Sequence, residues 1–178
     1  MVLKSNIITA YLLLVVIVST PAKTYCQQSD TAKVKVSFAG YPFPKPMGWV
    51  NDFEHMFSRK QIDTLTNIIV ANERLTTNQI SIVTIKDTII NADNIKDYGT
   101  ALFNAWGVGV KGKNNGVLIC LVPGKHLIRI SNGYGIDGKM TDEETKQIID
   151  NIITPEFKKG DYYAGIKNGV LAIIDKIK

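Results

Sequence analysis

The segment from Trp106 to Glu144 constrains the fold of this chain more than any other. It contains two apolar runs, Gly116 to Val122 and His126 to Ser131, which are separated only by Pro123-Gly124-Lys125. Both runs are rich in Ile, Leu and Val, a composition that favours strands. Because the connection is too short for a crossover, the two runs are predicted to form an antiparallel hairpin.

A hairpin brings its outer ends together. The loop before its first strand (107–115) should therefore lie beside the loop after its second strand (132–140). Both loops are rich in Gly, Asn and Asp, and the second leads directly into a helix that Thr141 is predicted to cap. We call residues 107–115 and 132–140 the double loop, and we expect the chemistry of the protein to be found there.

The composition indicates one globular domain. The 178 residues are 45% hydrophobic and 21% charged, which excludes a disordered or fibrous chain. The formal charge of +5 comes from 21 basic and 16 acidic residues. Lys4 and Lys23 lie in the leader described below, so the remainder is near +3 (19 minus 16). No block of Lys or Arg exceeds two residues, and we therefore expect no nucleic-acid partner. We also expect a monomer.

The first 26 residues have the pattern of a secretory signal peptide. Lys4 precedes an uncharged, mostly apolar run from Ile7 to Val18, and small residues follow at 19–22. The run is short of the roughly 20 residues that span a bilayer, although an uncleaved anchor is the alternative. We expect an exported protein, periplasmic or secreted. Lipid attachment at Cys26 is less favoured, because Lys23-Thr24-Tyr25 precede it instead of small residues.

Residues 27–46 are predicted to form an extended arm, and residues 47–178 the folded domain. The arm has prolines at 42, 44 and 46, which disfavour a helix, and residues 34–38 could form an edge strand. Apolar spacing and capping residues then predict helices, strands and a buried Cys120. The helices are expected at 58–72, 93–106, 141–153 and 161–178, and the remaining strand at 79–85.

A strand, a helix and a strand between residues 79 and 122 form a crossover unit, which is long enough to connect parallel strands. Adding the hairpin return gives a mixed sheet of about four strands. The helices that connect and follow these strands should cover both faces of the sheet. The predicted fold class is therefore α/β, with three α/β/α layers.

Five sequence runs in the same order resemble the TPM domain family. They are GWVND, QISIVTI, WGVGVKGKNNGVL, RISNGYGIDGKMTD and PEFKKGDYYAGI, and the resemblance extends over about residues 49–174. It implies a Rossmann-like α/β/α domain in an extracytoplasmic or lumenal compartment. Members of the family are associated with calcium binding, with acid phosphatase activity, and with assembly or repair of membrane complexes. The chain has Asp137 where the family often has Glu, and Asn114 where it often has Asp.

The double loop offers the oxygen atoms that calcium prefers, six to eight of them per ion. Asn114, Asn115, Asp137 and Asp142 are the candidate ligands in this segment. Asp52 matches the Asp of the family's V-x-D element, and the resemblance adds it to the set. Calcium is the expected ion, and magnesium is the alternative.

Each of these residues also has a purely structural interpretation. Asp137-Gly138 and Asn114-Asn115 are typical of turns. Thr141 and Glu144 have the spacing of a capping box, and Asp142 suits the positive end of a helix. Tyr134 could contact a partner from an exposed loop, or it could pack on Trp106 and close the double loop.

Phosphatase chemistry of the covalent kind is not indicated. Cys120 lies within a strand and lacks an arginine six residues later, and Asp52-Phe53-Glu54 is not an Asp-x-Asp element. His55 and His126 have no nucleophile elbow beside them, and His55 is expected at the surface. Hydrolysis assisted by a bound cation is the remaining route.

Two functions are therefore predicted from the sequence. The first is an extracytoplasmic TPM domain that binds a divalent cation, with metal-assisted phosphatase activity as an extension. The second is a non-catalytic accessory module for the assembly or maintenance of a membrane-protein complex of the cell envelope.

Overall fold

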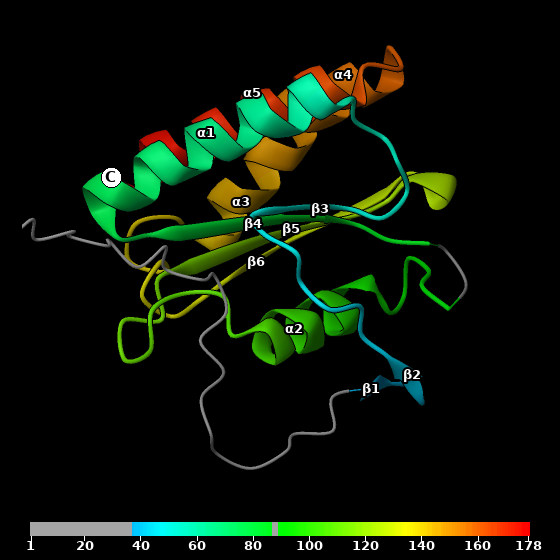
Figure 1. The fold of residues 1–178 in the computed structure, drawn as a ribbon, viewed down its shortest axis with the longest axis horizontal. Coiled ribbons are helices and arrows are strands. Elements are labelled where there is room, and N and C mark those ends of the chain that lie inside the picture. Colours follow the sequence, from blue (N-terminus) through cyan, green and yellow to red (C-terminus); the bar gives the residue numbers. More distant parts are fainter. Residues whose placement is uncertain (1–36, 87–88) are drawn as a thin grey trace, which may run out of the picture.

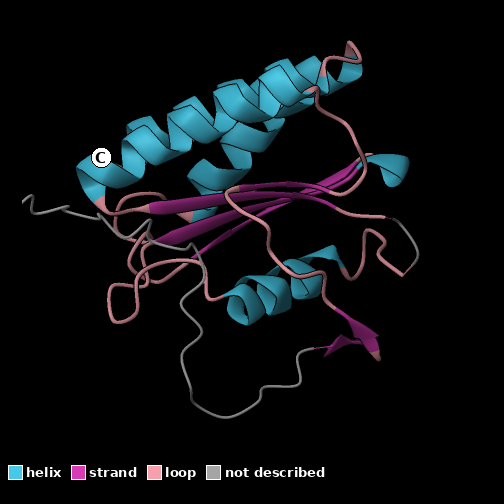
Figure 2. Cartoon of the chain, in the orientation of Figure 1, coloured by secondary structure: helices cyan, strands magenta, loops and turns pink. Residues whose placement is uncertain are grey.

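The computed structural model of the chain describes residues 37–86 and 89–178. The predicted leader at 1–26 and the first ten residues of the predicted arm lie outside the described residues. Within the described part, no helix is both long enough and apolar enough to cross a membrane. Figure 2 shows a layer of strands between two layers of helices, as the sequence predicts.

The central sheet has four strands in the order β3-β4-β5-β6. The first three strands are parallel, and β6 returns antiparallel to β5 across the predicted hairpin. The α/β class and the mixed sheet are confirmed. The sequence did not predict β3, which has only three residues and no detectable periodicity. The strands are β3 (Val50–Asp52), β4 (Gln79–Thr84), β5 (Gly116–Val122) and β6 (Leu127–Asn132).

The helices that pack on the first apolar cluster cover one face of the sheet, and α2 (Ile95–Trp106) covers the other (Figure 1). β5 is buried along its whole length because its alternate side chains enter two separate apolar clusters. Cys120 is fully buried in the cluster beneath α2, as predicted, and burial raises the pKa of its thiol to about 12. The helices are α1 (Arg59–Thr76), α3 (Asp142–Ile148) and α5 (Tyr162–Ile177) on one face, and α2 (Ile95–Trp106) on the other.

The two parallel crossovers have opposite hands. Both move one strand further in the same direction, from β3 to β4 and from β4 to β5. However, α1 and α2 lie on opposite faces of the sheet (Figure 1). One of the two crossovers must therefore be left-handed, an arrangement found in only about 2% of such connections. The loops that leave β3 and β4 consequently diverge toward different faces.

The predicted helix caps are largely confirmed. Ser58 caps α1 in a capping box with Gln61, and the Asp161 side chain accepts from the backbone N–H of Ala164 at 2.9 Å. α1 continues four residues beyond its predicted end, to Thr76. Asn94, one of the two predicted residues, is the N-cap of α2, but its side chain makes no capping hydrogen bond. The turn formed by Asp93 and Asn94 is held by the side chain of Asn91. Its Oδ1 accepts the N–H groups of both these residues.

The predicted helix at 141–153 is not one regular helix. After α3 the chain forms a π-helical turn, η2 (Ile149–Ile153), and then a short helix, α4 (Thr154–Lys158). Pro155 has no N–H to continue the α-helical ladder, and its ring would clash with a carbonyl one turn earlier. The wider π turn accommodates both effects.

The described part of the arm, residues 37–46, packs against α2. A small hairpin pairs β1 (Ser37–Phe38) with β2 (Tyr41–Pro42), separately from the main sheet. The rings of Phe38 and Phe43 meet Tyr98 edge-on at 5.4 and 5.2 Å between centroids. The edge strand predicted at 34–38 begins outside the described residues, and its described end pairs within the arm instead of with the sheet.

Candidate functional site

The structure brings the two halves of the double loop together, as predicted. The N–H of Gly133 donates to the carbonyl oxygen of Gly116 at 2.9 Å, and the N–H of Gly135 donates to that of Asn114 at 3.0 Å. A Cβ atom on Gly135 would lie 2.0 Å from the Lys113 carbonyl oxygen. Only glycine permits the loops to approach this closely, so the close contact is built into the sequence.

Asn115 is buried and holds the double loop to the turn after α1. Its side-chain oxygen accepts from the N–H of Val110 at 2.9 Å, and its amide nitrogen donates to the carbonyl oxygen of Thr77 at 2.9 Å. The same nitrogen lies 3.3 Å from the side-chain oxygen of Asn78. With 5% of its surface exposed, Asn115 shapes the loop and does not present its amide to solvent.

Two further residues that the sequence analysis missed also shape this site. The side-chain oxygen of Gln79 accepts from the N–H of Gly109 at 2.8 Å, while its amide nitrogen donates to Glu73 at 2.9 Å. Thr77 adopts a left-handed conformation, and its hydroxyl accepts from the Lys113 ammonium group at 3.1 Å. The signal that could have identified Gln79 was its position. It is the first residue of β4 and lies directly opposite Gly116, the first residue of β5.

Asn114, Asp137 and Asp142 are the candidate ligands that face solvent. Asn114 has a φ of +50°, and all three side chains are exposed. Among the described residues, the carboxylates of Asp137 and Asp142 have no hydrogen-bond or ion-pair partner. No group of three or more His, Cys, Asp and Glu side chains converges within residues 37–86 and 89–178. Within the described residues, the double loop therefore presents the Asn114 amide and the unpaired Asp137 carboxylate, and the start of α3 presents the unpaired Asp142 carboxylate.

The capping interpretation of the neighbouring helix start is confirmed. Thr141 Oγ1 accepts from the N–H of Glu144 at 3.2 Å, and the Glu144 carboxylate accepts from the N–H of Thr141 at 2.9 Å. Glu144 also pairs with Lys176 of α5 at 2.7 Å. The hydrogen bonds from Lys176 and from the Thr141 backbone lower the pKa of Glu144 to about 2. Glu144 is thus fully engaged, while Asp142 at the start of α3 is not.

Trp106 and Tyr134 do not pack together. Tyr134 is 86% exposed at the tip of its loop, whereas the indole N–H of Trp106 donates to the carbonyl oxygen of Pro44 at 2.9 Å. The predicted contact between Trp106 and Tyr134 is therefore wrong, because the Trp106 indole contacts the arm at Pro44. The alternative prediction, an exposed loop aromatic, describes the position of Tyr134.

Asp52 lies at the opposite end of the sheet from the double loop. It is level with Thr84 at the carboxyl ends of β3 and β4, whereas the double loop adjoins Gln79 and Gly116 at the amino ends of β4 and β5. Thr84, beside Asp52, and Gln79, beside the double loop, are five residues apart along β4, which is about 17 Å at the usual rise of a strand. The structure therefore corrects the grouping of Asp52 with the other four candidates, since one ion cannot contact both ends.

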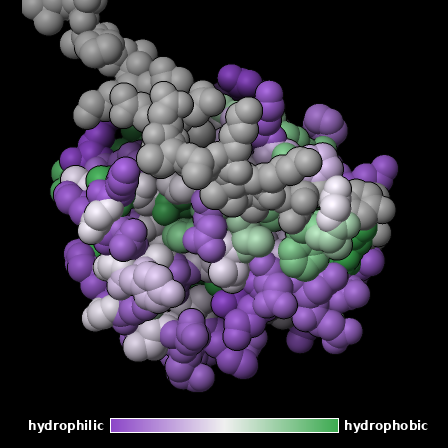
Figure 3. Space-filling view, turned by 90° about the horizontal axis from the view of Figure 1, so that it is seen from below, coloured by the Kyte–Doolittle hydropathy of each residue, from purple (hydrophilic) through white to green (hydrophobic). Residues whose placement is uncertain are grey.

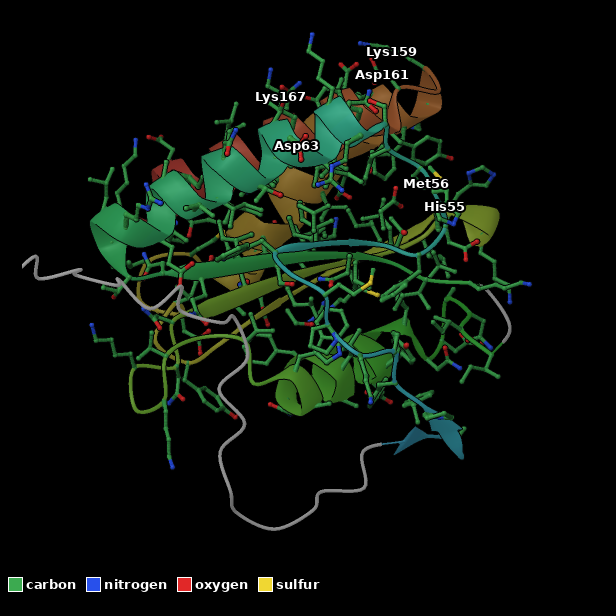
Figure 4. All side chains as sticks on the ribbon, viewed as in Figure 1. His55, Met56, Asp63, Lys159, Asp161 and Lys167 are labelled. Carbon is green, nitrogen blue, oxygen red and sulfur yellow. The ribbon has the colours of Figure 1, made fainter. Side chains whose placement is uncertain are left out.

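The Asp52 carboxylate organises the loop after β3. It accepts from the N–H groups of Met56 at 3.0 Å and Phe57 at 2.8 Å, and from the Thr84 hydroxyl at 2.7 Å. His55 is exposed on this loop, as predicted. Figure 4 shows His55 and Met56 beyond the carboxyl end of β3, on the side of the molecule opposite the double loop. Asp52 therefore has a structural role that the sequence did not reveal.

A four-stranded mixed sheet between two helical layers, with a double loop closed by glycines, defines an α/β/α domain. The sequence profile of the TPM domain matches residues 50–176, and the chain belongs to the TPM domain family. The matched residues fall inside the domain predicted at 47–178. Among curated proteins, none matches this chain.

Three solved structures share this fold. The N-terminal domain of a protein from P. gingivalis is 29% identical, with a TM-score of 0.65 over 71% of this chain and 80% of that one. The BA42 protein from the psychrophilic bacterium Bizionia argentinensis is 20% identical, with a TM-score of 0.60 over 70% and 83%. The N-terminal domain of the cg2496 protein from Corynebacterium glutamicum is 15% identical, with a TM-score of 0.55 over 74% and 81%.

Proposed function

We propose that this TPM domain is exported and binds a divalent cation at the double loop, through Asn114, Asp137 and Asp142. One observation carries the proposal. The hydrogen bond from Gly135 to Asn114 ties the two loops together, while the Asp137 and Asp142 carboxylates are exposed and have no partner among residues 37–86 and 89–178. Export rests on the leader pattern of residues 1–26.

The donor set suits calcium or magnesium. Carboxylate and amide oxygens are hard ligands, and Asn114, Asp137 and Asp142 supply some of the six to eight oxygens that calcium takes. Backbone carbonyls and water would supply the others. Because two carboxylates carry little charge for such a site, we expect affinity in the range of about 10⁻⁴ to 10⁻³ M, that of weak extracellular sites. Asn115 supports this site by holding the loop.

A thermal-melt titration of the purified protein with calcium and magnesium tests the proposal. At a hundred times its dissociation constant, a cation should stabilise the protein by about 2.7 kcal/mol. Asp137→Asn and Asp142→Asn should each reduce this stabilisation, whereas the adjacent Glu143→Gln should retain it. A melting temperature that saturating calcium leaves unchanged would contradict the cation site.

Phosphate-ester hydrolysis is the catalytic extension of the same proposal. Asn114, Asp137 and Asp142 would hold the cation, which would supply Lewis-acid polarisation of the phosphate. Attack by water would then break the P–O ester bond and release the alcohol and inorganic phosphate. Hydrolysis of a generic phosphate monoester should then require the added cation and stop in Asp142→Asn. Activity that survives this substitution would assign the hydrolysis to another site or to a contaminant.

A second function, an accessory module for a membrane-protein complex of the cell envelope, is favoured by Tyr134. A large aromatic side chain with 86% exposure at a loop tip is a suitable anchor for a protein partner. In that case Tyr134→Ala should abolish co-purification of the partner from the cell envelope. The same substitution should leave the calcium-dependent stabilisation unchanged, which separates the two functions.

A further inference from the structure

The loops that follow β3 and β4 open a crevice at the carboxyl ends of these strands. β3 leads to α1 on one face of the sheet, and β4 leads to α2 on the other (Figure 1). Open α/β sheets bind ligands outside the carboxyl ends of their strands at such a switch point, where neighbouring connections diverge. The double loop lies at the other end of the sheet, so this crevice is a separate candidate site.

A pocket of about 450 Å³ occupies this crevice. It is lined by residues from the arm, from both diverging loops and from α2, among them Pro44, Phe53, Ile85 and Tyr98. Its volume falls within the range of roughly 300–1,000 Å³ of small-molecule sites, which are mostly apolar with a few polar groups. Figure 3 views the α2 side and shows hydrophobic side chains gathered toward the right, the side of the carboxyl ends in Figure 1.

Two opposite charges line the same pocket without neutralising each other. Glu54 and Lys86 both line it, and neither side chain has a hydrogen-bond or ion-pair partner within the described ranges. The position of Glu54 is set by the sheet, because its N–H donates to the Thr84 hydroxyl at 3.0 Å and that hydroxyl donates to Asp52 at 2.7 Å. The pocket thus has an anchored anionic side, a cationic rim and apolar walls.

The side chain of Tyr98 forms part of the apolar wall. Its ring is held between Phe38 and Phe43 of the arm, and the described part of the chain provides no partner for its hydroxyl. Burial is the main cause that raises the pKa of this phenol well above its ordinary value, so the group remains a neutral hydrogen-bond donor.

We propose that the pocket binds a small zwitterion with an apolar side chain, of the chemical class of a hydrophobic amino acid. Glu54 would pair with the ammonium group, Lys86 with the carboxylate, and the walls would enclose the apolar side chain. An uncharged apolar ligand would cover the half-buried Glu54 without pairing its charge, which is unfavourable. A ligand with one charge would leave either Glu54 or Lys86 unpaired.

Chemical-shift titration of the ¹⁵N-labelled protein tests this proposal with four probes. L-phenylalanine carries both charges and an apolar side chain, and it should bind with a dissociation constant of about 1 mM. Glycine lacks the side chain, L-phenylalanine amide lacks the carboxylate, and N-acetyl-L-phenylalanine lacks the ammonium group. Each of these should bind at least about threefold more weakly, with shifts at the pocket residues.

Two charge substitutions identify the partners. Lys86→Met should remove the preference for L-phenylalanine over its amide, and Glu54→Gln should remove the preference over the N-acetyl derivative. Lys158→Met, on α4 in the opposite helical layer, is the matched control and should keep both preferences. Equal binding of all four probes, or no shift at the pocket residues at tens of millimolar, would overturn the proposal. Neither result bears on cation binding at the double loop.

Discussion

The Thr84 hydroxyl donates a 2.7 Å hydrogen bond to the Asp52 carboxylate across the parallel strands β4 and β3. Asp52 also accepts two backbone N–H groups from the loop that leads into α1, and it is only 9% exposed. A single carboxylate therefore joins the ends of two strands to the start of a helix. Since each partner is a donor that burial removes from water, the loss of this carboxylate should be costly.

We predict that Asp52→Ala lowers the free energy of unfolding by about 2–4 kcal/mol, because three donors lose their acceptor. Urea denaturation measures this directly. Asp63→Ala is the control: Asp63 forms an exposed i,i+4 pair with Arg59 at 3.2 Å, and its loss should cost no more than about 0.5 kcal/mol. Although Asp52→Ala should melt at a lower temperature, calcium should still raise that melting temperature. Loss of the calcium effect would contradict the placement of Asp52 away from the double loop.

Asn115 and Asn114 are adjacent but should respond differently to substitution. Asn115→Ala removes the partners of Val110 N–H, of the Thr77 carbonyl and of Asn78, and should cost about 2–3 kcal/mol of unfolding free energy. Asn114→Gly should change stability by less than about 0.5 kcal/mol, since a φ of +50° suits glycine. Chemical denaturation compares the two. Equal losses would show that the loop is not held by Asn115.

Glu144 should make the protein sensitive to acid. Its pKa of about 2 in the folded state lies below the ordinary value of about 4.3, because Lys176 and the Thr141 backbone favour the charged form. A carboxyl whose pKa is depressed by folding stabilises the protein above the unfolded value. That contribution is lost as the pH falls from about 4.3 toward 2.

The urea midpoint measured between pH 6 and pH 2 tests this expectation. Glu144→Gln should have a lower midpoint at pH 6 and a shallower fall in acid than the native chain. Because Glu144 is at the surface, 1 M salt should reduce the difference. The adjacent Glu143→Gln should follow the native profile, and a Glu144→Gln profile parallel to the native one would refute the assignment.

The sequence predicted the double loop because a three-residue connection between two apolar runs leaves only one way to pair them. The caps at Ser58, Thr141 and Asp161 could also be predicted from the sequence, since they depend on residues within one helical turn. Both predictions rest on local physics: chain length in one case, and backbone donors that need acceptors in the other.

β3 could not be predicted in the same way, because its three residues are defined by pairing with residues 82–84, about thirty positions later. The misplacement of Asp52 followed from that omission. Once Val50–Asp52 is recognised as a strand parallel to β4, its last residue must lie at the carboxyl edge, away from Gly116. The pocket at the switch point was hidden for the same reason, since it depends on which face each crossover covers.

Gly165 in α5 provides a test of how closely the helices pack. A Cβ atom at this position would lie 2.7 Å from the ring of Phe157 in α4 and 3.0 Å from the carbonyl oxygen of Ile153 in η2. Alanine favours a helix over glycine by about 1 kcal/mol, but the clash should dominate. We therefore expect Gly165→Ala to lower the free energy of unfolding by about 1–3 kcal/mol. Asn168→Ala, exposed on the same helix, should be neutral or slightly stabilising.

A double substitution separates the clash from an effect on the helix itself. Phe157→Leu alone should destabilise the protein by removing part of a ring that packs on Tyr162 at 4.6 Å between centroids. Combined with Gly165→Ala, it should cost less than the sum of the single changes, because the smaller side chain makes room for the added methyl group. Additive losses, or stabilisation by Gly165→Ala, would show that α4 and η2 can move away from α5 at little cost.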